Sequence, residues 1–260
     1  MRRKRLSAEA TVPGWPEGTA RILLQTVDST NAEAARIADV TAAPAWILAA
    51  EQTGGRGRRG RPWSSPRGNF HATLLLHPTE PADQVALRSF LAALALRDAC
   101  VSLTGNRLGF ALKWPNDVLL NGGKLAGILL ESSGSAGRVS HLAIGVGVNL
   151  IAAPPPGDVE PGAMTPVSLL GETGVRVTPE AFLTALAIAC DQWETVFTTR
   201  GFAPLRDAWL ADAARLGEVI TARTGRDTLT GRFETIDDHG ALVLDTARGR
   251  LAIPAAEIFF

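Results

Sequence analysis

The stretch KWPNDVLLNGGKLAGILLE, residues 113–131, places a strong turn signal between two apolar runs. Asn121-Gly122 separates DVLL from LAGILLE, and Asn-Gly in that setting favours a β-hairpin. Pro115 fixes φ and lacks a backbone N–H, so a strand has to end there and project its last residues. The hairpin returns Lys124 toward KWPND, where a carboxylate or an acyl phosphate can sit. The alternative is an ordinary strand-to-turn junction with an exposed hairpin lysine.

Further strands and helices flank this hairpin on both sides. Short apolar runs predict strands, and longer amphipathic or fully apolar stretches predict helices. We expect strands at 20–27, 45–53, 69–78, 108–115 and 140–150, and helices at 28–39, 84–103, 179–200 and 204–215. Thr30 and Glu33 have capping-box spacing at the start of the first helix. The sequence predicts an α+β body with a mixed, mostly antiparallel sheet flanked by helices.

The sequence pattern changes near Gly217. Short strands separated by glycine and aspartate turns follow, which is typical of a small β barrel. Residues 153–166, rich in proline and glycine, predict an exposed loop. We therefore expect three parts: a flexible N-terminal segment at 1–20, a main domain at 21–214 and a β-barrel domain at 215–260.

Charge and composition exclude several classes of protein. Lys plus Arg equals Asp plus Glu, at 26 each, so no overall positive field exists to hold DNA or an anionic membrane. The basic start lacks the apolar core of a signal peptide, and no apolar run approaches the ~20 residues of a membrane span. Cys100 and Cys190 lie in apolar helical patterns and predict buried, reduced thiols. We expect a soluble, cytoplasmic protein.

The stretch EQTGGRGRRGRPW, residues 51–63, sets four arginines among four glycines. Glycines let backbone N–H groups approach an anion, and arginines bind phosphate oxygens. Trp63 adds a flat face for a base. A P-loop is excluded because Arg61-Pro62 stands where Lys-Ser/Thr is needed. A dinucleotide fingerprint in GVGVNL is excluded because Leu150 replaces its third glycine. A nucleotide phosphate, a nucleic acid and plain solvent remain as alternatives.

The histidines and serines give no catalytic signature of their own. The four histidines show no pair at metal-ligand spacing, and no serine lies in a nucleophile elbow. Metal-dependent hydrolysis and serine hydrolysis are therefore unsupported.

DSTN, Gln52 leading into GGRGRRGRPW, the 113–131 stretch and GVGVNL together resemble the biotin–protein ligases, or biotin–[acetyl-CoA-carboxylase] ligases. The resemblance covers roughly residues 20–260. It implies the class II synthetase-like fold of biotin–lipoate ligase catalytic domains at 21–214, which would bind biotin and ATP. It also implies an SH3-like barrel at 215–260. Only about 20 residues precede the first strand, too few for the DNA-binding domain of some members, so we expect the form without it.

The resemblance implies a two-step reaction. ATP converts biotin to biotinyl-5'-AMP, and biotin then passes to a lysine of a biotin carboxyl carrier domain of acetyl-CoA carboxylase or a related carboxylase. ATP and Mg²⁺ are the implied cofactors, neither DNA nor membrane is a partner, and the protein is a monomer or homodimer. The alternatives are a lipoate or octanoate ligase or transferase and, less favoured, a nucleic-acid-binding protein.

The same resemblance assigns roles to individual residues, with the arginine-glycine loop closing over the adenylate. Biotin would contact Ser29, Thr30, Asn31, Gln52, Arg56, Gly57, Arg58 and Lys124. ATP and the adenylate would contact Arg58, Arg61, Trp63, Asn116 and Asn149. The catalytic set would be Lys124, Arg58, Lys113 and Asp117. No tight protein metal site is implied, and Mg²⁺ would enter with ATP near Asp117.

Overall fold

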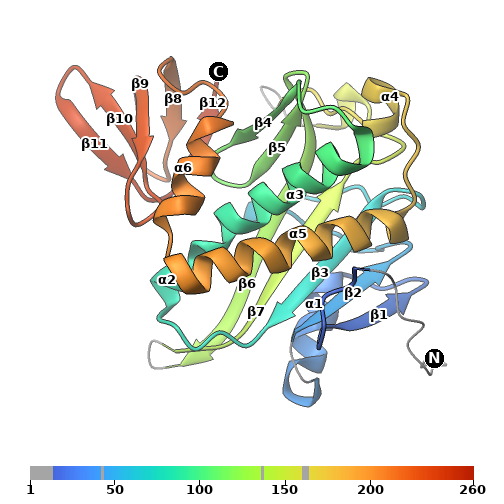
Figure 1. Cartoon of the computed structure of the whole chain (residues 1–260). Coiled ribbons are helices and arrows are strands. Elements are labelled where there is room, and N and C mark those ends of the chain that lie inside the picture. Colours follow the sequence, from blue (N-terminus) through green and yellow to red (C-terminus); the bar gives the residue numbers. More distant parts are fainter. Residues whose placement is uncertain (1–13, 42–43, 136–137, 160–163) are drawn as a thin grey trace.

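A seven-stranded sheet forms the centre of the main domain (Figure 1). The computed structural model describes residues 14–41, 44–135, 138–159 and 164–260. The strand order is β1-β2-β3-β7-β6-β5-β4, with β1 and β2 parallel and every other pair antiparallel. The strands are β1 Ala20–Leu24, β2 Ala45–Ala49, β3 Phe70–Leu76, β4 Phe110–Lys113, β5 Asp117–Leu120, β6 Gly123–Ser135 and β7 Arg138–Val148. The predicted mixed, mostly antiparallel sheet is confirmed.

Helices cover both faces of this sheet, and β2 shows why. Successive side chains of a strand point to opposite faces. Trp46 and Leu48 pack into the large core beneath α3 and α5, whereas Ile47 packs into a smaller core beneath α1. The helices are α1 Thr30–Ile37, α2 Ala82–Ala86, α3 Arg88–Thr104, α4 Leu169–Thr173, α5 Pro179–Arg200 and α6 Ala203–Ala211. Short 3₁₀ turns lie at η1 Ala38–Val40, η2 Arg58–Gly60 and η3 Pro156–Asp158.

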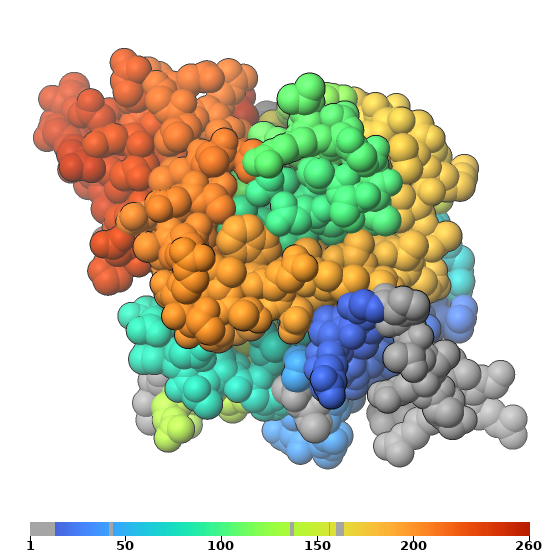
Figure 2. Space-filling view, in the orientation of Figure 1, coloured from blue at the N-terminus to red at the C-terminus, as the bar shows by residue number. Residues whose placement is uncertain are grey.

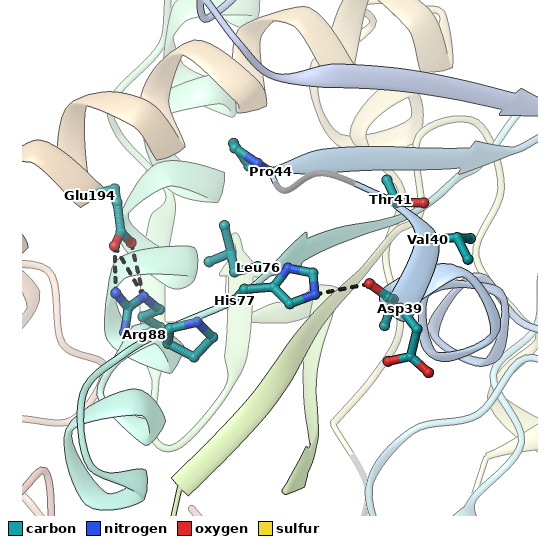
Figure 3. A pocket seen from close by; sticks show the side chains of 10 residues that line it. Asp39, Val40, Thr41, Pro44, Leu76, His77, Arg88 and Glu194 are labelled. Atoms are coloured by element: carbon teal, nitrogen blue, oxygen red, sulfur yellow. Dashed lines mark hydrogen bonds and ion pairs between the residues drawn. The ribbon is translucent and has the colours of Figure 1, made fainter.

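The two long helices are tied together at their buried sides. Arg88 of α3, with a side chain only 3% exposed, pairs with Glu194 of α5 at 2.6 Å (Figure 3). Both cysteines are buried as expected, and burial raises the pKa of the Cys100 thiol to about 12. No helix within the described residues combines the length and the apolarity needed to cross a bilayer.

The start of α1 differs from its prediction. Ser29, not Thr30, occupies the N-cap position, and its side chain makes no capping bond. The Thr30 hydroxyl instead donates to the side chain of Gln52 at 3.1 Å, and the Glu33 carboxylate pairs with Arg36. The predicted capping box is therefore wrong, because a distant residue, Gln52, binds the hydroxyl that was expected to cap the helix.

The C-terminal module is a five-stranded antiparallel sheet in the order β11-β10-β9-β8-β12. Its strands are β8 Val219–Arg223, β9 Thr228–Ile236, β10 Leu242–Thr246, β11 Gly249–Ile253 and β12 Glu257–Phe259. In the described strand pairing, β11 and β12 are the two edge strands of this sheet. The module forms a corner of the molecule beside α6 (Figure 2). The Phe233 ring meets Trp209 of α6 at 6.5 Å, and the Trp114 indole donates to the carbonyl of Gly240 at 3.1 Å.

Two further expectations fall partly on residues that the structure leaves undescribed. The predicted N-terminal segment at 1–20 lies outside the described residues up to residue 13, and the predicted loop at 153–166 does so at 160–163. The described part of that loop is more than an exposed connection. Its Thr165 carbonyl accepts from the backbone N–H of Lys124 at 2.8 Å, so it braces β6.

Candidate active site

A cavity of about 490 Å³ opens where α1, the arginine-glycine loop, the β5–β6 hairpin, the end of β7 and strand β12 meet. Every residue predicted for the site lines it. These residues are Ser29, Thr30, Asn31, Gln52, Arg56, Gly57, Arg58, Arg61, Trp63, Lys113, Asn116, Asp117, Lys124 and Asn149. The fold thus brings these predicted residues, which lie up to 120 positions apart in the sequence, to one cavity.

Gln52 organises the polar end of the cavity. Its amide oxygen accepts from the backbone N–H of Thr30 at 2.8 Å and from the Thr30 hydroxyl at 3.1 Å. Its amide nitrogen donates to the Ser65 hydroxyl at 3.0 Å. With the oxygen engaged twice, the second N–H is the group that Gln52 offers to a ligand. A ligand carbonyl is the matching partner.

Asn31 shapes this end, and with both amide hydrogens engaged it has only its side-chain oxygen to offer a ligand. Its amide nitrogen donates to Glu131 at 2.8 Å and to the carbonyl of Leu129, and its oxygen accepts from buried Thr73 at 2.6 Å. Asn31 also lies against Gly145, where a side chain would collide with it. Asn31 therefore sets the shape of the cavity wall at the polar end.

The arginine-glycine loop is fastened by carboxylates at both ends. Arg56 forms an ion pair with Glu131 at 3.1 Å, while Arg59, at 2.9 Å, and Arg61 both pair with Glu257 of β12. The side-chain hydrogen bond from Arg61 holds the pKa of Glu257 below its usual value. Strand β12 thereby supplies a wall of the cavity.

Arg58 and Lys113 are the more buried cations of the site. Arg58 reaches toward the side-chain oxygen of Asn116 at 3.4 Å. Burial lowers the pKa of Arg58, and the neighbouring Arg59 lowers it further. Burial also lowers the pKa of Lys113, against the opposing effect of Asp117. Cations removed from water in this way bind an anion more strongly than exposed ones do.

Lys124 and Asp117 form an ion pair with Nζ 2.7 Å from Oδ1. A bulge in the β5–β6 pairing makes this possible. Val118 pairs with Ala126 but Leu119 pairs with Lys124, so Leu125 is an extra residue. Lys124 and Gly127 are three positions apart and would face opposite sides of a regular strand. The bulge turns both toward the cavity.

Trp63 lies flat on two glycines of the sheet. A Cβ built on Gly147 would fall 2.5 Å from the indole nitrogen, and one on Gly127 would fall 3.4 Å from the ring. The indole nitrogen is buried and has no hydrogen-bond partner among the described residues. Lys124 Nζ lies 5.9 Å from the ring centroid. The ring and the ammonium group thus face the same space.

The two asparagines predicted to contact the nucleotide are held by backbone carbonyls. Asn116 donates to Ile128 at 2.6 Å, and Asn149 donates to Val167 at 3.1 Å. Each amide therefore has a fixed direction relative to the cavity.

Sequence reasoning missed several residues that build the site. Glu257 and Phe259 belong to the C-terminal module yet line the cavity, while Glu131, Thr73 and Ser65 hold lining residues from behind. Glu257, the single acid in PAAEIFF, was the available signal for a partner to the arginine loop. Nothing local marks Thr73 or Ser65.

A second hollow of about 770 Å³ lies near η1 and contains none of the predicted residues (Figure 3). His77 contacts the carbonyl of Ala38 at 3.0 Å there, and Arg88 is already paired with Glu194. The larger volume therefore does not identify the site. The predicted residues all line the smaller cavity.

The donor set of the cavity suits a metal that arrives with phosphates. Asp117, Asp158 and Glu257 are its carboxylates, and two of these already pair with cations. No group of three or more metal-binding side chains occurs among the described residues. Mg²⁺ usually takes one or two protein carboxylates and completes its shell with substrate phosphates and water. The residues fit that mode.

Comparison with known proteins places this geometry in context. Residues 23–149 match the model of the Biotin/lipoate A/B protein ligase family, and residues 216–260 match the Biotin protein ligase C terminal domain. The chain is 58% identical over 238 residues to a biotin–[acetyl-CoA-carboxylase] ligase of Paracoccus denitrificans, covering 92% of this chain and 99% of that protein. It is 31% identical to a bifunctional ligase/repressor BirA of Bacillus spizizenii, over 93% of this chain and 74% of that protein.

A solved structure agrees with the sequence comparisons. The biotin protein ligase of Aquifex aeolicus, determined in complex with biotin and ATP, superposes with a TM-score of 0.77 and 26% identity. The alignment covers 92% of this chain and 97% of that one. The likeness extends through both the main domain and the C-terminal module.

Proposed function

Because the chain belongs to the biotin/lipoate A/B protein ligase family, we propose that its 490 Å³ cavity holds biotin and ATP side by side. The chain is an ATP-dependent ligase that activates biotin to biotinyl-5'-AMP and transfers it to a lysine of a biotin carboxyl carrier domain. One observation carries the assignment of the site: all fourteen predicted residues line this single cavity.

The first step joins biotin to the nucleotide. A carboxylate oxygen of biotin attacks the α-phosphorus of ATP, a P–O bond forms, and pyrophosphate leaves. Negative charge gathers between the reacting groups, so cations fixed in advance lower the barrier. Lys124, turned inward by the bulge and held by Asp117, would contact first the biotin carboxylate and then the acyl phosphate. Arg58 would bind the α-phosphate from the loop.

The remaining lining residues divide between the two ligands. Thr30 and Gln52, with Ser29 and Asn31, form the polar end suited to the ureido head of biotin, and Arg56 and Gly57 would run along its tail. Arg61, Trp63, Asn116 and Asn149 would form the nucleotide end, with the Trp63 ring against adenine. Lys113 would neutralise phosphate oxygens. Mg²⁺ would accompany ATP near Asp117 and supply charge neutralisation of the phosphates.

The second step transfers the acyl group. The neutral amine of an acceptor lysine attacks the acyl carbonyl, an amide bond forms as the nitrogen loses a proton to solvent, and the C–O bond to AMP breaks with AMP keeping its electrons. The acceptor would be the carrier domain of acetyl-CoA carboxylase or a related carboxylase. We place this reaction in the cytoplasm, with no role for DNA or membrane, and assign 21–214 to catalysis and 215–260 to the C-terminal SH3-like β module.

The test is ATP–pyrophosphate exchange with purified protein. Exchange should depend on biotin and not on lipoate or octanoate, and one purified carrier domain should gain the mass of one biotinyl group. Exchange driven by lipoate alone would overturn the assignment in favour of a lipoate ligase. Salt-sensitive oligonucleotide binding without exchange would favour a nucleic-acid-binding protein.

A further inference from the structure

Ser65 joins the two ends of the cavity without lining it. Its hydroxyl accepts from the Gln52 amide at 3.0 Å and donates to the carbonyl of Trp63 at 3.2 Å. Gln52 belongs to the end proposed for biotin, and Trp63 to the end proposed for ATP. Ser65 itself is 9% exposed and is not among the described residues that form the cavity wall. One hydroxyl therefore connects two lining residues from behind.

The arginine-glycine loop closes on itself at this hydroxyl. The backbone N–H of Trp63 donates to the carbonyl of Gly55 at 2.9 Å, and that of Gly57 donates to Arg61 at 2.8 Å. These bonds make the stem of the loop a short ribbon whose base is Gly55 and Trp63. Ser65 holds that base against Gln52.

Gly55 confirms how closely the junction is packed. A Cβ at Gly55 would lie 2.6 Å from Ser65 Oγ, 2.8 Å from the Trp63 carbonyl oxygen and 3.0 Å from the Gln52 amide nitrogen. Distances under 3.0 Å require something to move. The three groups thus form one compact unit that leaves no room for a methyl group.

The chain beyond Ser65 is held firmly, so the hydroxyl has a fixed origin. The Pro66 carbonyl contacts His71 of β3 at 3.2 Å and accepts from the backbone N–H of Asn69 at the same distance. The Asn69 side chain in turn binds Ala152 at 2.7 Å. Ser65 is thus attached to the sheet, while Trp63, two residues earlier, belongs to the loop.

We infer that Ser65 is a positioning residue of the adenylation step: it fixes the base of the arginine-glycine loop, and so the place of Trp63, relative to Gln52. This inference rests on the proposed function. Thr30 alone still orients the Gln52 oxygen when Ser65 is changed, so the biotin end is held independently. At the nucleotide end, the Trp63 carbonyl loses its hydrogen bond to Ser65, and the loop base loses its link to Gln52. The effect of removing the hydroxyl therefore falls on ATP.

The experiment is steady-state pyrophosphate exchange with Ser65→Ala, varying ATP and biotin separately. We expect the KM for ATP to rise about tenfold, as for the loss of one or two neutral hydrogen bonds, with kcat and the KM for biotin changed less than about threefold. A matched control is Ser140→Ala, which removes a hydroxyl–carbonyl bond of 2.9 Å to Ser133 in the β6–β7 hairpin. It should behave as wild type.

A double-mutant cycle with Gly55→Ala tests the shared junction. Gly55→Ala alone should also raise the KM for ATP, because its methyl group displaces Ser65 and the Trp63 carbonyl. With Ser65→Ala present, the nearest obstructing atom is gone, so the added methyl should raise the KM by a smaller factor. Residues that act through one contact show this non-additivity, and independent residues do not. If the increases in the KM for ATP caused by the two substitutions simply multiply in the double mutant, the two residues act independently and the shared junction is wrong.

Two further outcomes separate this inference from its premise. If Ser65→Ala keeps the wild-type KM for ATP, or loses only kcat in proportion to its folded fraction, the positioning role is wrong while the ligase function stands. If wild type itself shows no biotin-dependent exchange, the proposed function fails first. Thermal unfolding of each variant supplies the folded fraction needed for this distinction.

Discussion

Lys124 and Asp117 face each other across the β5–β6 pair, with the ammonium nitrogen 2.7 Å from a carboxylate oxygen. The contact depends on the extra residue Leu125, because a regular strand would not place Lys124 on the same face as Gly127. The carboxylate holds the lysine side chain in place at the cavity. The bulge is therefore part of the catalytic apparatus that we propose.

Lys124→Ala should reduce biotinyl-AMP formation about 100- to 1,000-fold, the usual cost of removing one preorganised group from such a site. The Lys124 side chain is 32% exposed, so little core packing is lost and the melting temperature should stay near that of wild type. Biotin-dependent exchange and thermal unfolding measure the two effects. Arg107→Ala, which removes a cation 69% exposed, is the control. Near-normal adenylation by folded Lys124→Ala would refute the role.

Arg58→Gly should make labelling promiscuous. A lost hydrogen bond from a charged group weakens binding by up to ~1.5–3 kcal/mol, so biotinyl-AMP would escape before transfer. The released anhydride then acylates any nearby lysine amine. Biotin incorporated into albumin, with wild type run beside the variant, measures this escape. A variant that stays both active and confined to the carrier domain shows that Arg58 does not hold the intermediate.

Gly147→Ala should displace Trp63 from the sheet, because the new methyl group would lie 2.5 Å from the indole nitrogen. We expect the KM for ATP to rise at least about tenfold while the protein stays folded, since the methyl group faces the cavity and overpacking of this kind costs about 1–3 kcal/mol. Gly157→Ala is a suitable control, because its Cβ would meet nothing within 4 Å. Wild-type kinetics for Gly147→Ala would show that the packing of Trp63 on Gly147 does not affect ATP binding.

The arginine-glycine loop should be cut by trypsin after Arg56, Arg58 or Arg59 in the free protein and protected by biotinyl-AMP, while the Arg61–Pro62 bond resists trypsin. Its glycines have high backbone entropy, and its ion pairs with Glu131 and Glu257 join partly exposed side chains, which stabilise a loop only weakly. Glu257→Gln should speed cleavage of the free protein, because Arg59 and Arg61 lose their charged partner. Mass spectrometry of timed digests follows each site. Equal rates with and without the adenylate would contradict the closing loop.

Local signals were enough to predict most of the fold. The Asn121-Gly122 turn and the alternating or fully apolar runs each determine an element over a few residues, and the structure has these elements. The capping box failed because the Thr30 hydroxyl has a partner 22 residues away. The bulge at Leu125 also escaped prediction, since pairing register depends on both strands together.

The site was predictable as a set of residues but not as an arrangement. The resemblance to the biotin–protein ligases named the lining residues, and the types of several of them suit phosphate and carboxylate binding. Motifs cannot show which side chains hold the lining residues from behind, so Ser65 and Thr73 were missed. Glu257 was missed for a related reason: it lies almost 200 positions from the arginines that it pairs with.

Because strand β12 lies near the C-terminal end of this sequence, the order of protein synthesis affects when the active site is complete. A growing chain emerges from the ribosome N-terminal end first, so the biotin-facing residues are exposed and can fold well before Glu257 exists. Until β12 pairs with β8, the ion pairs of Arg59 and Arg61 with Glu257 have not formed. We expect a nascent chain to bind biotin earlier than it can retain a reactive anhydride. Formation of β12 would thus complete the wall of the cavity that is proposed to hold the intermediate.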